Sequence, residues 1–207
     1  MATLTPQGPQ APSEVTIKDR VLAVVSSPVA LAAICSIQTG SEILAFDPWP
    51  HQLELWNNAR LYRDLTVLKA RQLGCTEAFM LLALWECVSY TSGDDLVVSL
   101  NEREAGFNLS KATAMYDSTP DWFKEVFPER KRNAEEFRIG HGRTSAGIVS
   151  LPSSDNAGRG RNFRRAICDE FGRWGNSDER MASIEPTVAD TGSICRSSTA
   201  KGYNGLH

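Results

Sequence analysis

Apolar positions recur along this chain with two different spacings, and the alternation between them predicts an α/β fold. Apolar residues every three or four positions favour helices, and short continuous apolar runs favour buried strands. The expected helices cover residues 52–62, 79–88 and 102–115, and the expected strands cover residues 65–68, 96–100, 165–168 and 193–197. Strands that alternate with helices indicate a mainly parallel sheet with helices on both faces.

The first 45 residues do not follow this alternation. Residues 1–14 are rich in Pro, Gln, Thr and Ser, which predicts a disordered tail. Residues 15–45 are expected to form a small N-terminal helical segment, with helices over residues 15–25 and 29–37 and a turn at residues 39–41. Pro28 suits the start of the second helix, because the first turn needs no N–H from it.

The pattern is also less regular between residues 117 and 151. Residues 117–135 are polar and interrupted by proline, so they predict no defined element. Residues 137–139 and 147–151 are expected to pair as a hairpin around a glycine-rich turn.

Composition then removes several classes of protein. The 207 residues suffice for one domain with an appendage, and a net charge of −3 excludes a strongly basic nucleic-acid coat but not local contact with nucleic acid. The N-terminus lacks the pattern of a secretory signal, and the longest apolar stretch is too short and interrupted to cross a membrane. The five cysteines are scattered without a CxxC pair, which predicts a reducing, intracellular setting without disulfides or a zinc site.

In a parallel sheet, ligands bind beyond the carboxyl ends of the strands, so the chemistry is expected just after Leu68, Leu100, Cys168 and Ser197. The turn after Leu68 partly fits the phosphate-binding pattern GxxxxGK[ST]. Gly74 and Thr76 match its end, whereas Cys75 replaces the lysine and Lys69 stands at the first glycine position. A neutral thiol cannot hold polyphosphate, so Lys69 or Arg71 must supply the charge. The alternative is an ordinary strand-to-helix turn.

A second candidate follows the strand at residues 165–168. Asp169 and Glu170 end this apolar run, as the acidic pair of a Walker B element does. In that element the aspartate holds Mg²⁺ and the glutamate polarises the water that attacks the γ-phosphate. A solvated acidic turn is the alternative, but a phosphate-binding turn followed by such a pair favours nucleotide hydrolysis.

Through these motifs and their order, the chain resembles the ATPase domain of large terminase subunits, the DNA-packaging motors of tailed bacteriophages. The resemblance spans about residues 27–207. Its segments, in order, are residues 27–38, 46–52, 69–76, 150–154, 159–161, 169–171 and 198–204. It implies a RecA-like sheet of the P-loop NTPase type over residues 46–207, preceded by the small helical arm.

The resemblance also implies roles for individual residues. Gln52 matches the segment that contacts adenine, Thr76 and Asp169 match Mg²⁺ ligands, and Glu170 matches the catalytic base. Ser198 and Thr199 match the coupling motif that senses the γ-phosphate. The full set of expected ATP-binding residues is Gln52, Lys69, Ala70, Arg71, Gln72, Leu73, Gly74, Cys75 and Thr76.

Arginines complete the expected catalytic set. Arg71 matches an arginine common in the terminase phosphate-binding loop, and Lys69 matches a lysine that some members carry at its start. Arg159 is the candidate arginine finger, acting on the site of a neighbouring subunit, with Arg161 as its competitor. A plain surface arginine is the alternative for Arg159.

At the level of function, the resemblance implies an Mg²⁺-dependent ATPase that drives double-stranded DNA into a procapsid in the host cytoplasm. The implied partners are the portal protein, the small terminase subunit and further copies of the chain in a ring. Residues 130–132 and 159–165 are the local candidates for DNA contact. The competing interpretations are a helicase-like ATPase and a non-catalytic fragment.

The chain ends at His207 without anything that resembles the family's nuclease domain, so nuclease activity is not expected. We therefore expect a piece of a longer protein or one product of a split reading frame, with a last strand that exposes an unpaired edge.

Overall fold

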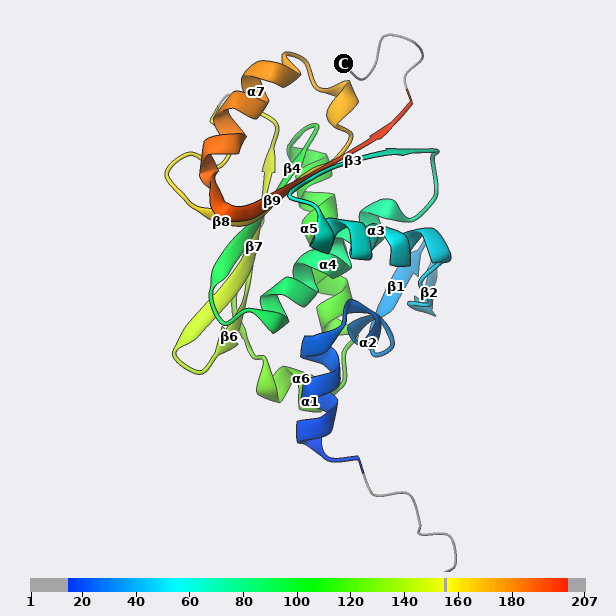
Figure 1. Ribbon diagram of the computed structural model, residues 1–207. Coiled ribbons are helices and arrows are strands. Elements are labelled where there is room, and N and C mark those ends of the chain that lie inside the picture. The colour runs from blue at the N-terminus through cyan, green and yellow to red at the C-terminus, as the bar shows by residue number, and fades with distance from the viewer. Residues whose placement is uncertain (1–14, 155, 201–207) are drawn as a thin grey trace, which may run out of the picture.

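The computed structural model describes residues 15–154 and 156–200, and a seven-stranded mixed sheet forms its centre (Figure 1). The strand order is β3-β9-β8-β4-β7-β6-β5. The strands are β3 (Asp64–Lys69), β4 (Gly93–Ser99), β5 (Glu129–Arg132), β6 (Glu136–His141), β7 (Thr144–Pro152), β8 (Phe163–Cys168) and β9 (Val188–Thr199). From β3 to β7 in this order all neighbours are parallel, whereas β6 and β5 add antiparallel pairs. The prediction of a mainly parallel sheet is confirmed.

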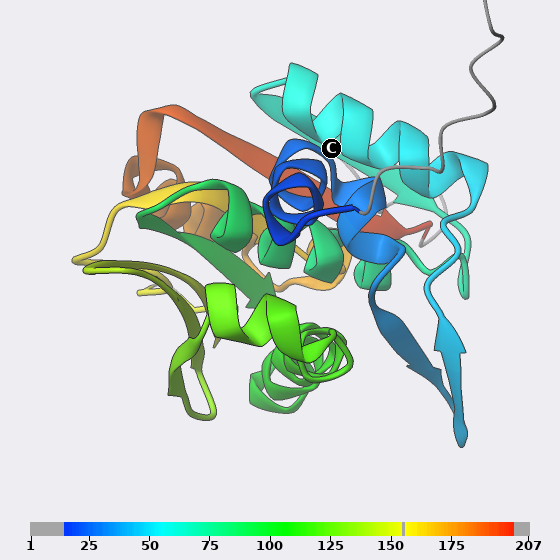
Figure 2. The same ribbon diagram turned by 90° about the horizontal axis from the view of Figure 1, so that it is seen from below.

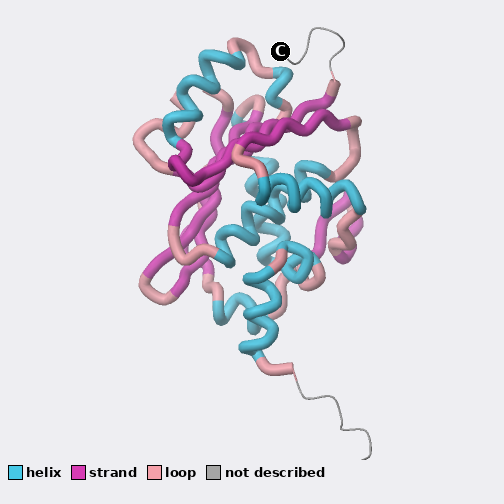
Figure 3. Tube along the Cα trace, in the orientation of Figure 1, coloured by secondary structure: helices cyan, strands magenta, loops and turns pink. Residues whose placement is uncertain are grey.

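Helices cover both faces of this sheet, as the alternation predicted (Figure 3). Helices α3 (Pro50–Leu61), α4 (Cys75–Ser89) and α5 (Glu102–Asp117) pack on the face that Val97 and Ile167 fill. Helix α7 (Ser177–Ile184) and the 3-10 turns η1 (Phe171–Arg173) and η2 (Glu185–Thr187) belong to the other face, which Leu96 and Val98 fill. Neighbouring residues of a strand thus serve opposite faces, because successive side chains alternate.

Helix α4 is apolar almost all round, since the sheet, α1 (Ile17–Ser26), α2 (Pro28–Ala32), α3 and α5 surround it. Among the described residues, no helix is both long and apolar enough to cross a membrane.

The N-terminal segment contains a hairpin that the sequence did not predict. The expected helix over residues 29–37 ends at Ala32, and β1 (Ser36–Thr39) pairs with β2 (Glu42–Ala45). Gly40 provides the turn at φ +62°, a conformation that glycine adopts without steric cost. The resulting two-stranded hairpin extends away from the body of the molecule (Figure 2). The predicted tail, residues 1–14, lies outside the described residues.

The segment expected to be irregular, residues 117–135, contains α6 (Asp121–Val126) and strand β5. Phe123 and Phe127 anchor it in the core, so its apolar residues, hidden among polar ones, decide its structure. The predicted hairpin is confirmed as β6 and β7, and Gly142 at φ +60° lies in its turn.

Two expectations about sheet edges are wrong. Residues 65–68 were expected to be buried, yet β3 is an edge strand with alternating exposure, and Leu68 is 61% exposed. The last strand, β9, was expected to expose an edge, yet it lies between β3 and β8. Strand order depends on long-range pairing, which apolar periodicity does not encode.

Candidate functional site

A strained turn connects β3 to α4 at the carboxyl edge of the sheet. Gln72 and Gly74 both have φ +61°, a left-handed conformation that is uncommon for a residue other than glycine. A Cβ at Gly74 would lie 2.6 Å from Nε2 of Gln52, so this position also lacks room for a side chain. The turn ends at the N-terminus of α4, where unpaired backbone N–H groups and the helix dipole favour an anion.

The first turn of α3 braces this loop from behind. Gln52, which is 4% exposed, donates from Nε2 to the carbonyl of Gly74 at 2.8 Å and accepts from the N–H of Trp49 at 2.9 Å. Nε2 of His51 lies 2.7 Å from the carbonyl oxygen of Leu73. Both ends of the Gln52 amide thus contact backbone, as expected for a residue that caps a helix, and its contact with adenine stays a prediction.

Asp169 lies at the meeting point of four elements. Its N–H continues the ladder of β8 by donating to the carbonyl of Val98 at 2.8 Å. Its carboxylate accepts hydrogen bonds from Ser197 of β9 at 2.9 Å, Asn108 of α5 at 3.2 Å and Thr76 of α4 at 3.5 Å. The side chain is therefore held from three sides.

Glu170, the next residue, turns its side chain toward β3 and β9. It has φ +51°, and its carboxylate forms an ion pair with Nζ of Lys69 at 2.9 Å. The hydroxyl of Thr199 donates to it at 2.8 Å, and Nε of Arg173 lies 3.5 Å away. Burial alone would raise the pKa of Glu170, but hydrogen bonds from Lys69 and Thr199 outweigh it and lower the pKa below its ordinary value.

The fold therefore brings together two segments that are far apart in the sequence. The turn after β3 and the acidic pair after β8 meet through Lys69 with Glu170 and through Thr76 with Asp169. Between them lie β9 and its hydroxyl residues, because β9 pairs with both strands. Parallel strands end at one edge, which is why these groups converge.

Two residues of the turn differ in their setting. Arg71 is exposed, whereas Cys75 is buried, and burial raises the pKa of its thiol above the ordinary value. Cys75 therefore stays neutral and adds no charge for phosphate. The side chain of Lys69 is only 10% exposed and already faces the site.

Arg159 lies away from this cluster. It precedes β8 by four residues, beside Pro186 and Thr187, which come just before β9. The six residues of β8 separate the two ends of the strand by roughly 20 Å, at about 3.3 Å per residue. Arg159 therefore does not join the site of its own chain. Arg161, its competitor for the finger role, also lies away from this site, with a guanidinium nitrogen 3.5 Å from the carboxylate of Glu136.

Several of the basic residues expected to contact DNA are held by acidic partners. Arg132 pairs with Asp117 and Glu129, and Lys131 pairs with Glu136. Arg165 is 5% exposed and forms a buried ion pair with Glu86 at 2.7 Å. The expectation that Arg165 contacts DNA on the surface is wrong, because the fold uses its charge inside the protein.

Sequence reasoning missed Asn108 and Ser197. Asn108 is 2% exposed and donates to both Ser99 and Asp169. It stands within the buried stripe of α5 formed by Ala105, Leu109 and Ala112. A lone amide in an otherwise apolar stripe is the signal that could have identified it, since buried polar groups need partners.

The donors present fit a small divalent cation. Mg²⁺ prefers carboxylate and hydroxyl oxygens and keeps several water ligands. Asp169 and Thr76 supply such oxygens 3.5 Å apart. Within residues 15–154 and 156–200, no cluster of three or more His, Cys, Asp or Glu side chains is arranged to hold a metal ion.

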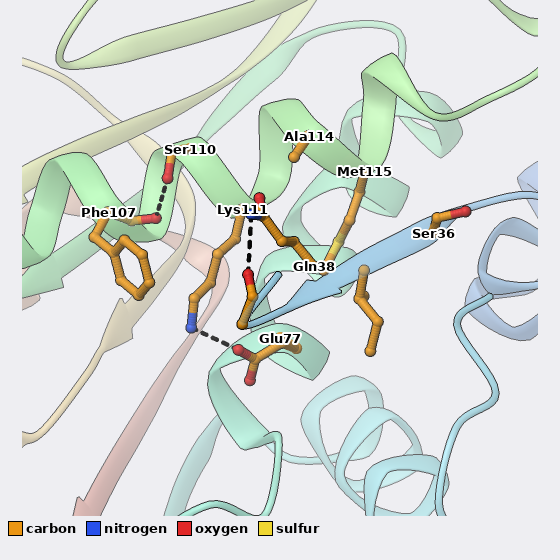
Figure 4. Close-up of a pocket in the computed structure, with 10 residues that line it drawn as sticks. Ser36, Gln38, Glu77, Phe107, Ser110, Lys111, Ala114 and Met115 are labelled. Carbon is orange, nitrogen blue, oxygen red and sulfur yellow. Dashed lines mark hydrogen bonds and ion pairs between the residues drawn. The ribbon is translucent and has the colours of Figure 1, made fainter. Parts of the chain in front are cut away.

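A small pocket borders this site between α5 and the β1–β2 hairpin (Figure 4). Lys111 reaches across it to Glu77 of α4 at 2.6 Å and lies over the ring of Phe107. Glu77 also faces the neighbouring cavity beside Gln72 and Gly74. The hairpin thus forms one wall of the region around the turn between β3 and α4.

Comparison with known proteins identifies the fold. No protein-family model matches the chain, and no curated protein does. Among solved structures, a mutant ATPase domain of the large terminase of Thermus phage P74-26 has a TM-score of 0.63 and 16% identity, covering 77% of this chain and 68% of that one. The large terminase of bacteriophage HK97 has a TM-score of 0.66 and 16% identity, covering 90% of this chain and 39% of that one.

The large terminase of a thermophilic bacteriophage, solved in complex with ATP-gamma-S, also matches, with a TM-score of 0.55 and 10% identity. That match covers 72% of this chain and 37% of the other chain. At these identities the comparisons establish a shared fold. This chain spans well under half of the length of the HK97 terminase and of this thermophilic phage terminase.

Proposed function

We propose that this domain binds ATP with Mg²⁺ at the carboxyl edge of its sheet and hydrolyses it as the ATPase of a phage DNA-packaging motor. The observation that carries this proposal is the contact between Lys69 and Glu170 at 2.9 Å, next to that between Thr76 and Asp169. These contacts join a phosphate-binding type of turn to an acidic pair. The shared fold with large terminase ATPase domains supports the same conclusion.

The turn supplies the binding step. Residues 70–74 and the first N–H groups of α4 cradle the phosphates, because a helix N-terminus attracts anions. Lys69 and Arg71 provide the positive charge that Cys75 lacks. A bound phosphate attracts the Lys69 ammonium, which is held by Glu170 when no phosphate is present.

The acidic pair supplies the chemical step. Glu170 is ionised near neutral pH, since its pKa is lowered, and it orients and deprotonates the attacking water. Asp169 and the hydroxyl of Thr76 would hold Mg²⁺, which when bound would neutralise charge on the phosphates. Asn108 and Ser197 keep the Asp169 carboxylate in position.

Strand β9 supports the proposed coupling. Thr199 contacts the Glu170 carboxylate through both its hydroxyl, at 2.8 Å, and its N–H, at 3.3 Å. The hydroxyl of the adjacent residue, Ser198, is buried. A shift of Glu170 during turnover therefore acts directly on the end of β9. We further propose that hydrolysis drives the translocation of double-stranded DNA. The chain would act in a homo-oligomeric ring, with the portal protein and the small terminase subunit as partners, in the host cytoplasm.

The decisive experiment compares Glu170→Gln with the parent protein. The variant removes the base but keeps the size of the side chain, so MgATP hydrolysis should fall by about 10²–10⁴-fold while a fluorescent ATP analogue still binds. Lys69→Ala should instead weaken binding of the analogue. Glu102→Gln, an exposed glutamate at the start of α5, is the matched control and should hydrolyse ATP at the parent rate.

If Glu170→Gln hydrolyses ATP as fast as the parent, the catalytic assignment is wrong. If the parent binds the analogue without any turnover, the non-catalytic interpretation replaces ours. Cys75 is the residue that favours that interpretation, because its thiol stands where the usual loop has a lysine.

A further inference from the structure

A hollow rich in arginine lies at the amino edge of the sheet, at the other end of β8 from Asp169. It measures about 510 Å³ and is walled by the ends of α3 and α4 and by the starts of β8 and β9. The cations that matter to its chemistry are Arg60, Arg63 and Arg164, whereas the charge of Arg165, which also lines it, is used by the buried pair with Glu86. We call it the amino-edge hollow.

A bulge in β8 explains why two consecutive arginines line this hollow. In a regular strand, Arg164 and Arg165 would point to opposite faces. The register of β8 shifts between Phe163 and Arg165 against β9, and a matching shift occurs against β4. Bulges re-aim side chains and are common beside functional sites. The bulge therefore brings Arg164 to the hollow beside the Arg165–Glu86 pair.

Aromatic rings position the guanidinium groups of Arg60 and Arg164, and one nitrogen of Arg164 lacks a hydrogen-bond partner among the described residues. Arg164 lies 4.9 Å from the ring centroid of Tyr90, and Arg60 lies 5.1 Å from that of Trp85. Stacking on a ring fixes the plane of a guanidinium, and the Arg60 guanidinium is also exposed. Arg164 already donates from Nε to Asp95 and from Nη1 to two backbone carbonyls at the start of β4. Nη2 of Arg164 is a buried donor that has no hydrogen-bond partner. Buried polar atoms are normally satisfied, and Oδ2 of Asp95 beside it is also unpaired, so the pairing at this end of the hollow is incomplete.

The charges around the hollow leave an excess of cation. Glu86 balances Arg165 in their buried pair, and Asp95 accepts from Nε of Arg164 at 3.0 Å. Burial and the nearby Glu86 raise the pKa of Asp95 well above its ordinary value, against the opposing effect of Arg164. At the rim, Arg60 and Arg63 are exposed, and Asp190 lines the same hollow in addition to Glu86.

We propose that the amino-edge hollow binds a phosphate group of the DNA backbone. The exposed guanidinium groups of Arg60 and Arg63, with the unpaired Nη2 of Arg164 behind them, are donors of the kind that recognises phosphate oxygens. Such contacts position a protein on DNA without reading sequence. The choice of DNA rests on the proposed function, whereas the choice of a phosphate rests on the arginines themselves. A local site of this kind suits a chain whose net charge is −3.

The test measures binding of a short fluorescent DNA duplex to the full chain by anisotropy, without nucleotide, over a series of salt concentrations. The double variant Arg60→Glu/Arg63→Glu should raise Kd at least tenfold. Its plot of log Kd against log salt should lose about 2 units of slope, since each phosphate contact contributes about 0.9. Arg103→Glu, an exposed arginine at the opposite edge of the sheet, should bind like the parent.

If the double variant does not fold, Arg60→Ala/Arg63→Ala replaces it, with the same expected direction. Unchanged affinity in the folded variant, an equal loss in Arg103→Glu, or a parent that binds no duplex would each overturn the proposal. A parent that binds inorganic phosphate through Arg60 and Arg63 but no duplex would show a small-anion site instead. Because no ATP is present, Glu170→Gln should keep the parent affinity for DNA, so the result is independent of the proposed ATPase activity.

Discussion

At the scale of single residues, Gly74 is subject to two constraints, one on its backbone conformation and one on space, that disfavour any residue with a Cβ. Its φ of +61° disfavours L-residues, and its Cα lies so close to Gln52 that a Cβ would approach Nε2 to 2.6 Å. Gly142 has nearly the same φ, +60°, but open space around it. Comparing substitutions at Gly74 and Gly142 therefore distinguishes the cost of the backbone conformation from the cost of the steric contact.

We predict that Gly74→Ala lowers the free energy of unfolding more than Gly142→Ala does. The left-handed conformation costs about 1–2 kcal/mol in both variants, whereas only Gly74→Ala must also displace the Gln52 amide. Urea unfolding of both variants checks this. Binding of the fluorescent ATP analogue should weaken for Gly74→Ala alone, and equal losses of stability in both variants would contradict the steric explanation.

At the scale of elements, the two edges of the sheet are protected differently. Strand β5 carries the sequence Glu-Arg-Lys-Arg, whose charges pair with Asp117 and Glu136 and discourage pairing with another strand. Strand β3 has no such charge pattern, and Leu68 on it is 61% exposed. The β5 edge therefore depends on ion pairs, and its stability should depend on pH.

Glu136 is the centre of these ion pairs, with Lys131 at 2.6 Å and Arg138 at 2.8 Å. Burial opposes its ionisation, but hydrogen bonds from Lys131 and Arg138 and the charge of Arg161 lower its pKa from 4.5 to about 2. A lowered pKa in the folded state stabilises the protein above the unfolded pKa, and this contribution disappears as pH falls through the folded value.

The stability difference between the parent and Glu136→Gln should therefore be constant above about pH 5 and shrink between about pH 4.5 and 2. Urea unfolding over a pH series measures it. Glu135→Gln, an exposed neighbour, is the control and should show no such decrease. A difference that does not change down to pH 2 would mean that Glu136 gains nothing from its partners.

At the scale of the whole molecule, one sheet separates the proposed nucleotide site from the amino-edge hollow. Strand β8 carries Arg164 near its first residue and is followed by Asp169 and Glu170 after its last. Arg159 is on the amino side of the same strand, away from Glu170. On our proposal that Arg159 is the finger arginine, it therefore acts on the site of a neighbouring copy of the chain, which is the arrangement that a ring supplies.

Mixing two inactive variants tests this arrangement. Arg159→Ala keeps the base and Glu170→Gln keeps the finger, so each alone should hydrolyse ATP slowly, and an equimolar mixture should recover part of the parent rate. Turnover per chain of the parent should also rise with protein concentration as copies associate. No recovery in the mixture, together with parent turnover that is independent of concentration, would contradict a finger in trans.

The sequence by itself determined the local features of this protein. Periodicity identified the helices around residues 52–62, 79–88 and 102–115, and the acidic pair after Cys168 marked one strand end as chemically special. These features depend on neighbouring residues, so one sequence window contains all the necessary information.

Only the tertiary structure decided which of these features meet. The placement of β9 between β3 and β8 set Thr199 against Glu170 and Ser197 against Asp169, and it made β3 an edge strand. The buried partners Asn108 and Glu86, and the bulge that re-aims Arg164, likewise depend on contacts across the sheet. Such pairings join residues tens of positions apart, and their free energy comes from packing and hydrogen bonds that no local pattern contains.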